Sequence, residues 1–266
     1  ARRRSAHVRP HEGAVSRVAL ILVGTEILTG KVRDLNAPAL VDAAAERGHD
    51  VTEIRVVHDV TEAIVRAVRE LATSTDLLVT SGGIGPTIDD ITVPAVAEAL
   101  HRDLVHHPVL QRAVDVAFGH NPEQHRVWSR MAWVPEGTQP IESDAFRWPI
   151  VHVQNVACLP GVPALFARQL PVVLGTLPIP VRRHRAVLYV SAGEGVIAEP
   201  LAAVAAAFRD VAFGSYPVFG AERFSTRLTV EGVDEATVRE ALGWMEREIG
   251  TSVVEVAWGE RILRDD

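Results

Sequence analysis

Short apolar runs alternate with amphipathic stretches through the first hundred residues, and this alternation constrains the fold most. Three runs have the length of strands: residues 17–23, 51–57 and 77–80. Each run is followed by a stretch with helical spacing: residues 37–47, 61–71 and 93–100. Continuous apolar runs indicate strands buried on both faces, whereas apolar residues three and four apart indicate helices. The order predicts an α/β fold, a mainly parallel sheet sandwiched by helices.

The rest of the chain predicts further elements and a second domain. Helices are expected within residues 101–130 and 164–170, and strands within residues 131–141, 146–153 and 154–159. Prolines at residues 176–180 mark a linker. Beyond it the order strand, helix, strand, strand, helix, strand predicts a small α+β domain of the split-βαβ type. We therefore expect an arm at residues 1–16, an α/β domain at residues 17–175 and the small domain at residues 181–266.

The composition is that of a globular protein. Hydrophobic residues make up 47% and charged residues 23% of the 266 residues, and the formal net charge is −7. This charge argues against a general nucleic-acid binder. No apolar run reaches the length of a membrane span, and the basic start of the chain has no signal-like apolar core. We expect a cytoplasmic protein with no membrane partner.

A glycine-rich stretch, Thr80-Ser-Gly-Gly-Ile-Gly-Pro-Thr-Ile-Asp-Asp-Ile-Thr92, joins the third strand to its helix. This arrangement presents backbone N–H groups to an anion. Three glycines let the backbone take positive φ and approach a ligand closely: Gly82, Gly83 and Gly85. Asp89 and Asp90 would repel a phosphate unless a cation lay between, and their oxygens suit Mg²⁺ or a similar hard ion. The alternative is a tight turn with acidic residues that merely suit a helix N-terminus.

Polar residues follow all three strands, and ligands of parallel sheets bind at the carboxyl ends of strands. The candidates are Glu26, Asp34 and Asn36, then Asp59, then Ser81, Asp89 and Asp90. We expect Asp59 and Asp90 to face one cavity from the ends of adjacent strands. Taken singly, Asp59 is a helix-start residue and Asn36 an N-cap. Gly161 either brings amides to the same edge or only stiffens a turn.

Histidines and the single cysteine invite other functional interpretations. A metal site among His101, His106, His107, His120 and His125 would lack both an HExxH motif and a nearby cysteine, so exposed histidines are the favoured interpretation. Cys158 excludes an intramolecular disulfide. Its apolar surroundings in the sequence predict a buried, inert thiol.

The stretch Ser81–Thr92 resembles the signature of the molybdopterin-binding (molybdenum cofactor biosynthesis) domain family. It is most similar to the branch with competence-damage-inducible protein A and the N-terminal domain of eukaryotic FAD synthase. Further matching motifs are Gly24-Thr-Glu-Ile-Leu-Thr-Gly-Lys31 with Asp34-Leu-Asn36, Val57-His-Asp59, Phe146-Arg-Trp-Pro-Ile150, Gln154–Pro163 and Gly214-Ser-Tyr-Pro217. The family's alanine-proline-glycine segment is replaced by Ser143-Asp-Ala-Phe-Arg147. The resemblance includes neither an amidase nor an adenylyl-transferring domain, so it does not imply FAD synthesis.

This resemblance implies a molybdopterin-binding-like fold and a metal-dependent pyrophosphatase that acts on ADP-ribose or FAD-like dinucleotides. The metal would be Mg²⁺ or Co²⁺, with K⁺ as a further candidate, held by Asp59, Asp89 and Asp90. The catalytic candidates are Glu26, Asp34 and Asp90, and either of the first two is a candidate general base. The substrate-binding candidates are Gly24, Thr25, Asn36, Ser81, Gly82, Gly83, Gly85, Pro86, Thr87 and Gly161. Replacement of Asp90 by Asn is expected to abolish hydrolysis.

Two other functions remain open at this point. The same loops suit a molybdopterin-binding or adenylyl-transferring protein that holds a pterin phosphate. A regulatory domain that kept its pocket without turnover is the third possibility. In each case the expected partner is a small nucleotide or pterin phosphate, and we expect a homo-oligomer.

Overall fold

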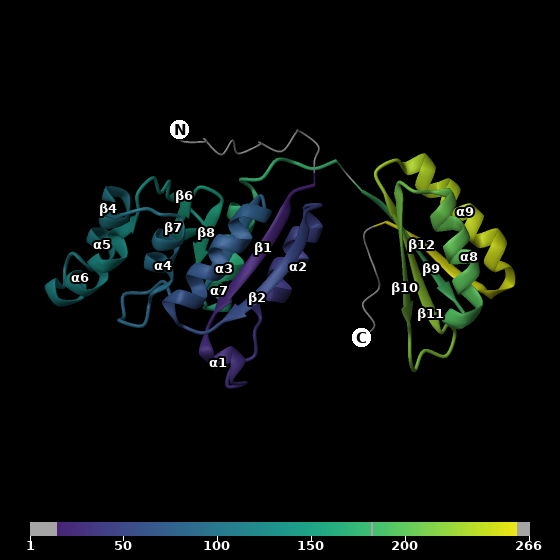
Figure 1. The fold of residues 1–266 in the computed structure, drawn as a ribbon, viewed down its shortest axis with the longest axis horizontal. Helices are drawn as coiled ribbons and strands as arrows, with labels where there is room; N and C mark the ends of the chain where they lie inside the picture. The colour runs from purple at the N-terminus through teal and green to yellow at the C-terminus, as the bar shows by residue number, and fades with distance from the viewer. Residues whose placement is uncertain (1–14, 182, 260–266) are drawn as a thin grey trace. The chain divides into compact units, whose positions relative to one another are not determined.

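The computed structural model describes residues 15–181 and 183–259. The chain divides into two compact units, with the boundary between Pro180 and Val181 (Figure 1). Residues 1–14 of the expected arm lie outside the described residues, as do residues 182 and 260–266 of the expected small domain. Within the described part of the chain, no helix has both the length and the apolar character needed to span a membrane.

A six-stranded sheet forms the centre of the first unit, in the order β2-β1-β3-β8-β7-β6. The strands are β1 (Arg17–Val23), β2 (Asp50–Val57), β3 (Leu77–Ser81), β6 (Ile141–Ser143), β7 (Phe146–Val153) and β8 (Val156–Leu159). The first four in the spatial order are parallel, and β7 and β6 are antiparallel additions. The predicted mainly parallel sheet is therefore confirmed.

The spatial order differs from the chain order in one respect that matters for the site. β1 pairs with both β2 and β3, so it separates these two strands. Our expectation that Asp59 and Asp90 follow adjacent strands is wrong. The third strand of the chain lies on the other side of β1 from β2, and periodicity along the chain does not encode that choice.

Helices cover both faces of this sheet (Figure 1). They are α1 (Thr25–Leu28), α2 (Asn36–Glu46), α3 (Thr61–Ser74), α4 (Thr92–Ala99), α5 (Pro108–Phe118), α6 (Pro122–Trp128) and α7 (Pro163–Leu174). Ala19, Ile21 and Val23 of β1 pack in one core cluster with α3 and α4. Val18, Leu20 and Leu22 pack in the other, with α2 and α7. Because successive side chains of a strand alternate between faces, a strand with a core on each side must be apolar throughout.

The segment between α4 and β7 builds a wall beside the sheet. It contains β4 (Leu104–His106), α5, α6, the short 3-10 helix η1 (Ser129–Ala132) and β5 (Trp133–Pro135), and β4 pairs with β5. Aromatic rings hold it together, since Phe118 stacks on Trp128 at 4.6 Å between ring centroids and Trp128 lies 6.2 Å from Trp148 of β7. The helices predicted within residues 101–130 and the strand predicted within residues 131–141 are therefore present. Together they position η1.

The second unit is a four-stranded antiparallel sheet in the order β10-β11-β9-β12. Its elements are β9 (His184–Val190), α8 (Glu194–Ala207), β10 (Val211–Pro217), β11 (Thr226–Gly232), α9 (Glu235–Ile249), η2 (Gly250–Ser252) and β12 (Val253–Trp258). Apolar residues of β9 and β11 pack with Val204 of α8 and Met245 of α9. The split-βαβ prediction agrees with this order, although β11 begins three residues later than the strand expected from residue 223.

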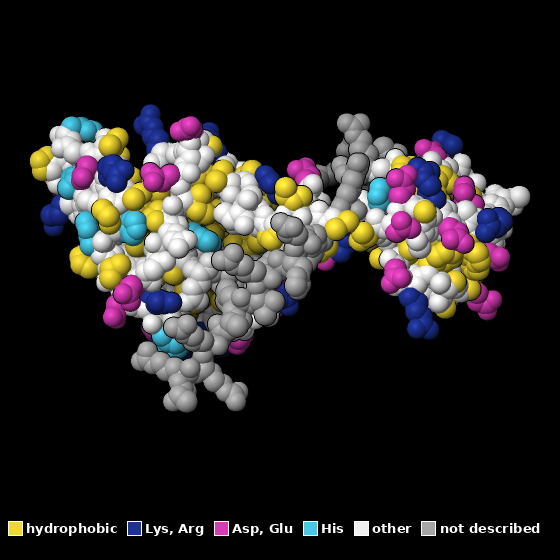
Figure 2. All heavy atoms as spheres, turned by 90° about the horizontal axis from the view of Figure 1, so that it is seen from above, with side chains coloured by type: hydrophobic (Ala, Val, Ile, Leu, Met, Phe, Trp, Pro, Cys, Tyr) yellow, Lys and Arg dark blue, Asp and Glu magenta, His cyan; other side chains and the backbone are white. Residues whose placement is uncertain are grey.

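On the face drawn in Figure 2, basic and acidic side chains are interspersed on both units, and histidines lie scattered over the first unit. His125 pairs with Asp115 at 2.7 Å between Nε2 and Oδ1, and His106 hydrogen-bonds to Gln111 at 3.0 Å. Across the described ranges, no group of three or more His, Cys, Asp or Glu residues is placed to hold a metal ion. The five histidines considered from the sequence are therefore not grouped as metal ligands in the described part of the chain.

Candidate functional site

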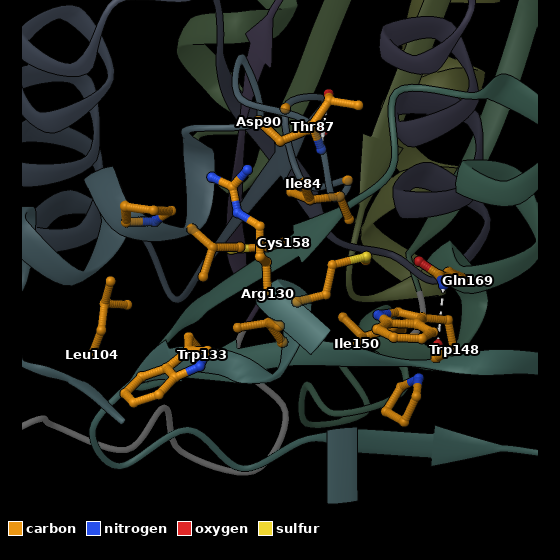
Figure 3. Close-up of a pocket in the computed structure, with 17 residues that line it drawn as sticks. Ile84, Thr87, Asp90, Leu104, Arg130, Trp133, Trp148, Ile150, Cys158 and Gln169 are labelled. Carbon is orange, nitrogen blue, oxygen red and sulfur yellow. Dashed lines mark hydrogen bonds between the residues drawn. The ribbon is translucent and has the colours of Figure 1, made fainter. Parts of the chain in front are cut away.

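A cavity of about 200 Å³ opens beside the glycine-rich loop, at the carboxyl edge of the sheet (Figure 3). One wall is the loop after β3, and the opposite walls come from η1, β5, the first half of β7, and α7. The lining residues are Gly83, Ile84, Gly85, Thr87, Asp90, Val93, Pro94, Leu104, Arg130, Met131, Trp133, Trp148, Pro149, Ile150, Val151, Cys158 and Gln169. Asp90 is the single carboxylate and Arg130 the single permanent cation among these lining residues.

The first half of the glycine-rich loop is fixed by close backbone packing. Gly82 and Gly83 have φ values of 100° and 64°, which glycine adopts without strain. A Cβ on Gly82 would lie 2.4 Å from the carbonyl oxygen of Val23. Thr92, fully buried at the start of α4, donates its hydroxyl to the carbonyl of Gly82 at 2.8 Å and its N–H to the carbonyl of Gly83 at 2.9 Å. The glycines are thus required by the geometry of the loop.

The next part of the loop leaves backbone donors unused. Hydrogen bonds within the described residues do not use the N–H groups of Gly83, Ile84 and Gly85. All three residues line the cavity. Successive backbone N–H groups at a glycine-rich turn can form a concave site for an anion.

The second half of the loop folds back on its own carboxylates. Oδ2 of Asp90 accepts from the N–H of Thr87 at 2.8 Å and lies 2.5 Å from the Thr87 hydroxyl, which also lies 2.5 Å from Oδ1 of Asp89. A hydroxyl has one proton, so it donates to one of these carboxylates at a time. The hydrogen bond from Thr87 lowers the pKa of exposed Asp89 from its ordinary value. Asp90 lies at the cavity wall, whereas Asp89 does not line it.

Asp34 and Asn36 have roles that differ from those expected from the sequence: Asp34 accepts hydrogen bonds at the start of a helix, and Asn36 points inward. Asp34 accepts from the N–H groups of Asn36 and Ala37 through its two oxygens, at 2.9 and 3.0 Å, so Asp34 holds the first turn of α2. Asn36 is buried and donates from Nδ2 to the Ser81 hydroxyl at 2.8 Å and to the carbonyl of Gly161 at 3.0 Å. Asn36 therefore ties together the loops after β1, β3 and β8, and its interpretation as an N-cap is wrong.

Asp59 lies at a separate part of the same edge. Its Oδ2 accepts from the N–H of Thr25 at 2.7 Å, at the start of α1, a short helix absent from our expectations. The neighbouring Glu26 is exposed, and a Cβ on Gly24 would come within 2.8 Å of its Oε1. None of these residues lines the cavity, so the structure does not bring Asp59, Glu26 or Asp34 into it with Asp90.

The proposed metal ligands do not fit a resident metal as they stand. Asp59 binds the N-terminus of α1, while Asp90 and Asp89 bind Thr87 on the other side of β1. Mg²⁺ needs oxygen ligands about 2.0–2.1 Å from one point. Over the residues that the structure describes, these three carboxylates are not gathered into such a group.

Several residues of the cavity were not singled out from the sequence. Arg130 of η1 reaches the loop, with Nη1 3.4 Å from the carbonyl oxygen of Pro86. Trp133 of β5 and Trp148 of β7 form part of the opposite wall (Figure 3). Gln169 of α7 is 6% exposed, and its Oε1 has no hydrogen-bond partner in the described part of the chain. Trp148 lies within one of the family-like motifs, which is the one signal that pointed to this wall.

Comparisons with known proteins agree with this architecture. Residues 19–178 match the family described as "Probable molybdopterin binding domain", and residues 182–257 match "FAD synthase, middle domain". A probable FAD synthase of Caenorhabditis elegans is 30% identical over 246 residues, which cover 83% of this chain and 47% of that protein. A CinA-like protein of Myxococcus xanthus is 32% identical over 185 residues, covering 64% of this chain and 43% of that protein. The chain spans about half the length of these two relatives.

A solved structure resembles the first unit. The crystal structure of CinA from Thermoplasma acidophilum, described as a protein of unknown function, aligns with a TM-score of 0.55 and 29% identity. The alignment covers 61% of this chain and 98% of that chain.

Proposed function

The chain belongs to the molybdopterin-binding domain family, and its second unit matches the FAD synthase middle domain. We propose that it is a nucleotide pyrophosphatase. The substrates would be ADP-ribose or FAD-like dinucleotides, and the reaction would need a divalent metal ion. One observation carries the proposal. Gly83, Ile84 and Gly85 line the cavity, and no acceptor in the described residues uses their N–H groups.

Phosphate would bind at these N–H groups. Thr92 anchors the loop at the carbonyls of Gly82 and Gly83, so the N–H donors of the loop are held in place before the ligand binds. Donors that are already oriented stabilise charge that develops in a transition state without a cost of reorganisation at that moment. The diphosphate bridge of the substrate would therefore lie against residues 83–85.

Asp90 is the candidate general base for this reaction, because it is the carboxylate at the cavity wall. It would accept a proton from the attacking water as the new bond between oxygen and phosphorus forms and the bridging phosphorus–oxygen bond breaks. Glu26 and Asp34 lie outside the cavity lining, and Asp34 is occupied at the start of α2. These positions favour Asp90 over the two bases proposed from the sequence.

The metal requirement is a separate part of the proposal. Because Asp59, Asp89 and Asp90 are not gathered in one place, we assign no step of the reaction to a resident metal ion. Assays with Mg²⁺ and Co²⁺ against a chelated sample, and with K⁺ against a potassium-free buffer, test this part by itself.

A second candidate is a molybdopterin-binding or adenylyl-transferring protein of molybdenum cofactor biosynthesis. The description of the matched family favours it, since that family is named for molybdopterin binding. The same N–H groups of residues 83–85 would then hold a pterin phosphate.

One experiment separates the two candidates. Purified protein is incubated with ADP-ribose or FAD across a titration of each metal, and the mononucleotide products are measured. The proposal expects AMP from both substrates, with ribose 5-phosphate or FMN as the other product. Absence of hydrolysis under every metal, together with pterin fluorescence in the purified protein, would reject the pyrophosphatase and favour the second candidate.

A further inference from the structure

Arg130 is the cationic side chain of the cavity. It belongs to η1, faces the glycine-rich loop, and is exposed. Figure 3 shows its guanidinium directed toward the loop that carries Thr87 and Asp90. Among the described residues that line the cavity, no other is Lys or Arg. Whatever anion binds at residues 83–85 would therefore meet this one guanidinium.

The guanidinium is held loosely by its own protein. Its Nη1 donates a hydrogen bond of 3.4 Å to the carbonyl of Pro86, near the upper distance limit for such a bond. Within the described residues it forms no ion pair with a carboxylate. Most of its five N–H donors thus remain available to a ligand.

The backbone that carries Arg130 is, by contrast, firmly placed. Ser129 donates its hydroxyl to the carbonyl of His125 at 2.7 Å, and Ala132 is fully buried and accepts from the N–H of His107 at 2.8 Å. These contacts fix η1 against α5 and α6. A fixed backbone that carries a free guanidinium is the arrangement expected of a residue that positions an anion.

We propose that Arg130 supplies the positive charge that binds the diphosphate of the substrate, opposite the N–H groups of Gly83, Ile84 and Gly85. This assignment rests on the proposed function in one respect, the binding of a diphosphate at those N–H groups. Arginine suits the role, because its planar fork donates two parallel hydrogen bonds to phosphate oxygens. It also gives the site a cation that does not depend on the dispersed carboxylates of Asp59 and Asp89.

The test measures binding of inorganic pyrophosphate in the presence of EDTA, by titration calorimetry, so that no metal ion takes part. The unmodified chain is expected to bind pyrophosphate. Arg130→Met should weaken that binding about tenfold, because it removes both the charge and its hydrogen bonds, whose contribution the exposure of Arg130 limits. Arg130→Lys should give an intermediate affinity, because it keeps the charge and loses the fork.

Two controls separate this role from a structural one. Arg126→Met, on exposed α6 and outside the cavity lining, should leave the affinity unchanged. The difference between the unmodified chain and Arg130→Met should narrow as salt is raised, because salt screens an exposed charge. The thermal midpoint of each variant shows that the fold is retained.

The outcomes distinguish the two proposals. Equal affinity of Arg130→Met and the unmodified chain in EDTA would overturn the role of Arg130, and hydrolysis of ADP-ribose or FAD would then leave the proposed function standing alone. Binding that needs added Mg²⁺ or Co²⁺ and ignores Arg130 would overturn it as well. Binding that depends on Arg130 without any hydrolysis would support the charge assignment and count against the pyrophosphatase.

Discussion

The hydroxyl of Thr92 donates a hydrogen bond of 2.8 Å to the carbonyl of Gly82, so the helix that follows the glycine-rich loop also fixes the start of that loop. The bond is buried, and Thr92 has no exposed surface. The conformation of the proposed anion site therefore depends on a side chain that would not itself touch the ligand.

Thr92→Val should destabilise the protein and weaken pyrophosphate binding together. The change keeps the side-chain shape and leaves the carbonyl of Gly82 without its buried donor, which costs about 1–3 kcal/mol. Urea unfolding monitored by fluorescence measures the loss. Thr73→Val is the matched control, because Thr73 also donates to a backbone carbonyl, at 2.9 Å, but lies exposed on α3. Its cost should stay within about 0.5 kcal/mol.

Asp90→Asn should reduce hydrolysis of ADP-ribose or FAD about 10²–10⁴-fold, the usual contribution of a general base. The fold should persist, because the amide oxygen of Asn can still accept from the N–H of Thr87, the present partner of Asp90 at 2.8 Å. Turnover and thermal midpoint are measured together. Turnover equal to that of the unmodified protein would leave Asp90 with a purely structural role.

Asp115 should make stability depend on pH in the acid range. The hydrogen bond from His125, and then the one from Gln111, lower the pKa of Asp115 from its ordinary value. A carboxylate with a lowered folded pKa contributes stability above its unfolded pKa, and this contribution is lost as the pH falls through the folded pKa. Asp115→Asn should therefore lower the urea midpoint at neutral pH.

The difference between Asp115→Asn and the unmodified protein should shrink as the solution is acidified below the ordinary pKa of aspartate, about 3.9. Asp144→Asn, at an exposed turn between β6 and β7, serves as the control. A difference that stays constant over the whole acid range would show that the charge of Asp115 is not its cause.

Cys158 should react slowly with thiol reagents in the native protein. Burial raises the pKa of its thiol to about 11, so only about one molecule in a thousand carries the thiolate at pH 8. Labelling with iodoacetamide at pH 8, in buffer and in denaturing urea, measures the effect. Native labelling as fast as in urea would mean that the cavity wall formed by Cys158 opens readily to solvent.

The sheet could be predicted from the sequence because a strand buried on two faces must be apolar throughout, and every residue of β1 after Arg17 is apolar. The glycine-rich loop could also be predicted from the sequence, because Gly82 and Gly83 occupy backbone conformations that other residues rarely adopt. Both features are local, because each depends on the types of the residues that form it and not on distant parts of the chain.

The parts that the sequence did not reveal depend on side-chain direction and spatial order. Asp34 and Asn36 are both good helix-start residues, and only the structure shows that Asn36 turns inward to Ser81. Arg130 and Gln169 lie in helical segments, where polar residues are normally solvent-exposed, so their sequence positions do not indicate a cavity. Asp59 and Asp90 are separated because β1 lies between their strands.

Gly161 and Gly82 bring the loops that follow β8 and β3 close together, since a Cβ on Gly161 would lie 3.2 Å from the Cα of Gly82. A side chain at position 161 therefore depends on the position of the loop after β3. A Cβ on Gly161 would require the backbone at Gly82 to withdraw, and that backbone has little room because a Cβ on Gly82 would lie 2.4 Å from the carbonyl oxygen of Val23. The room available to residue 161 is therefore set by a strand on the other side of β3, two elements away from its own loop.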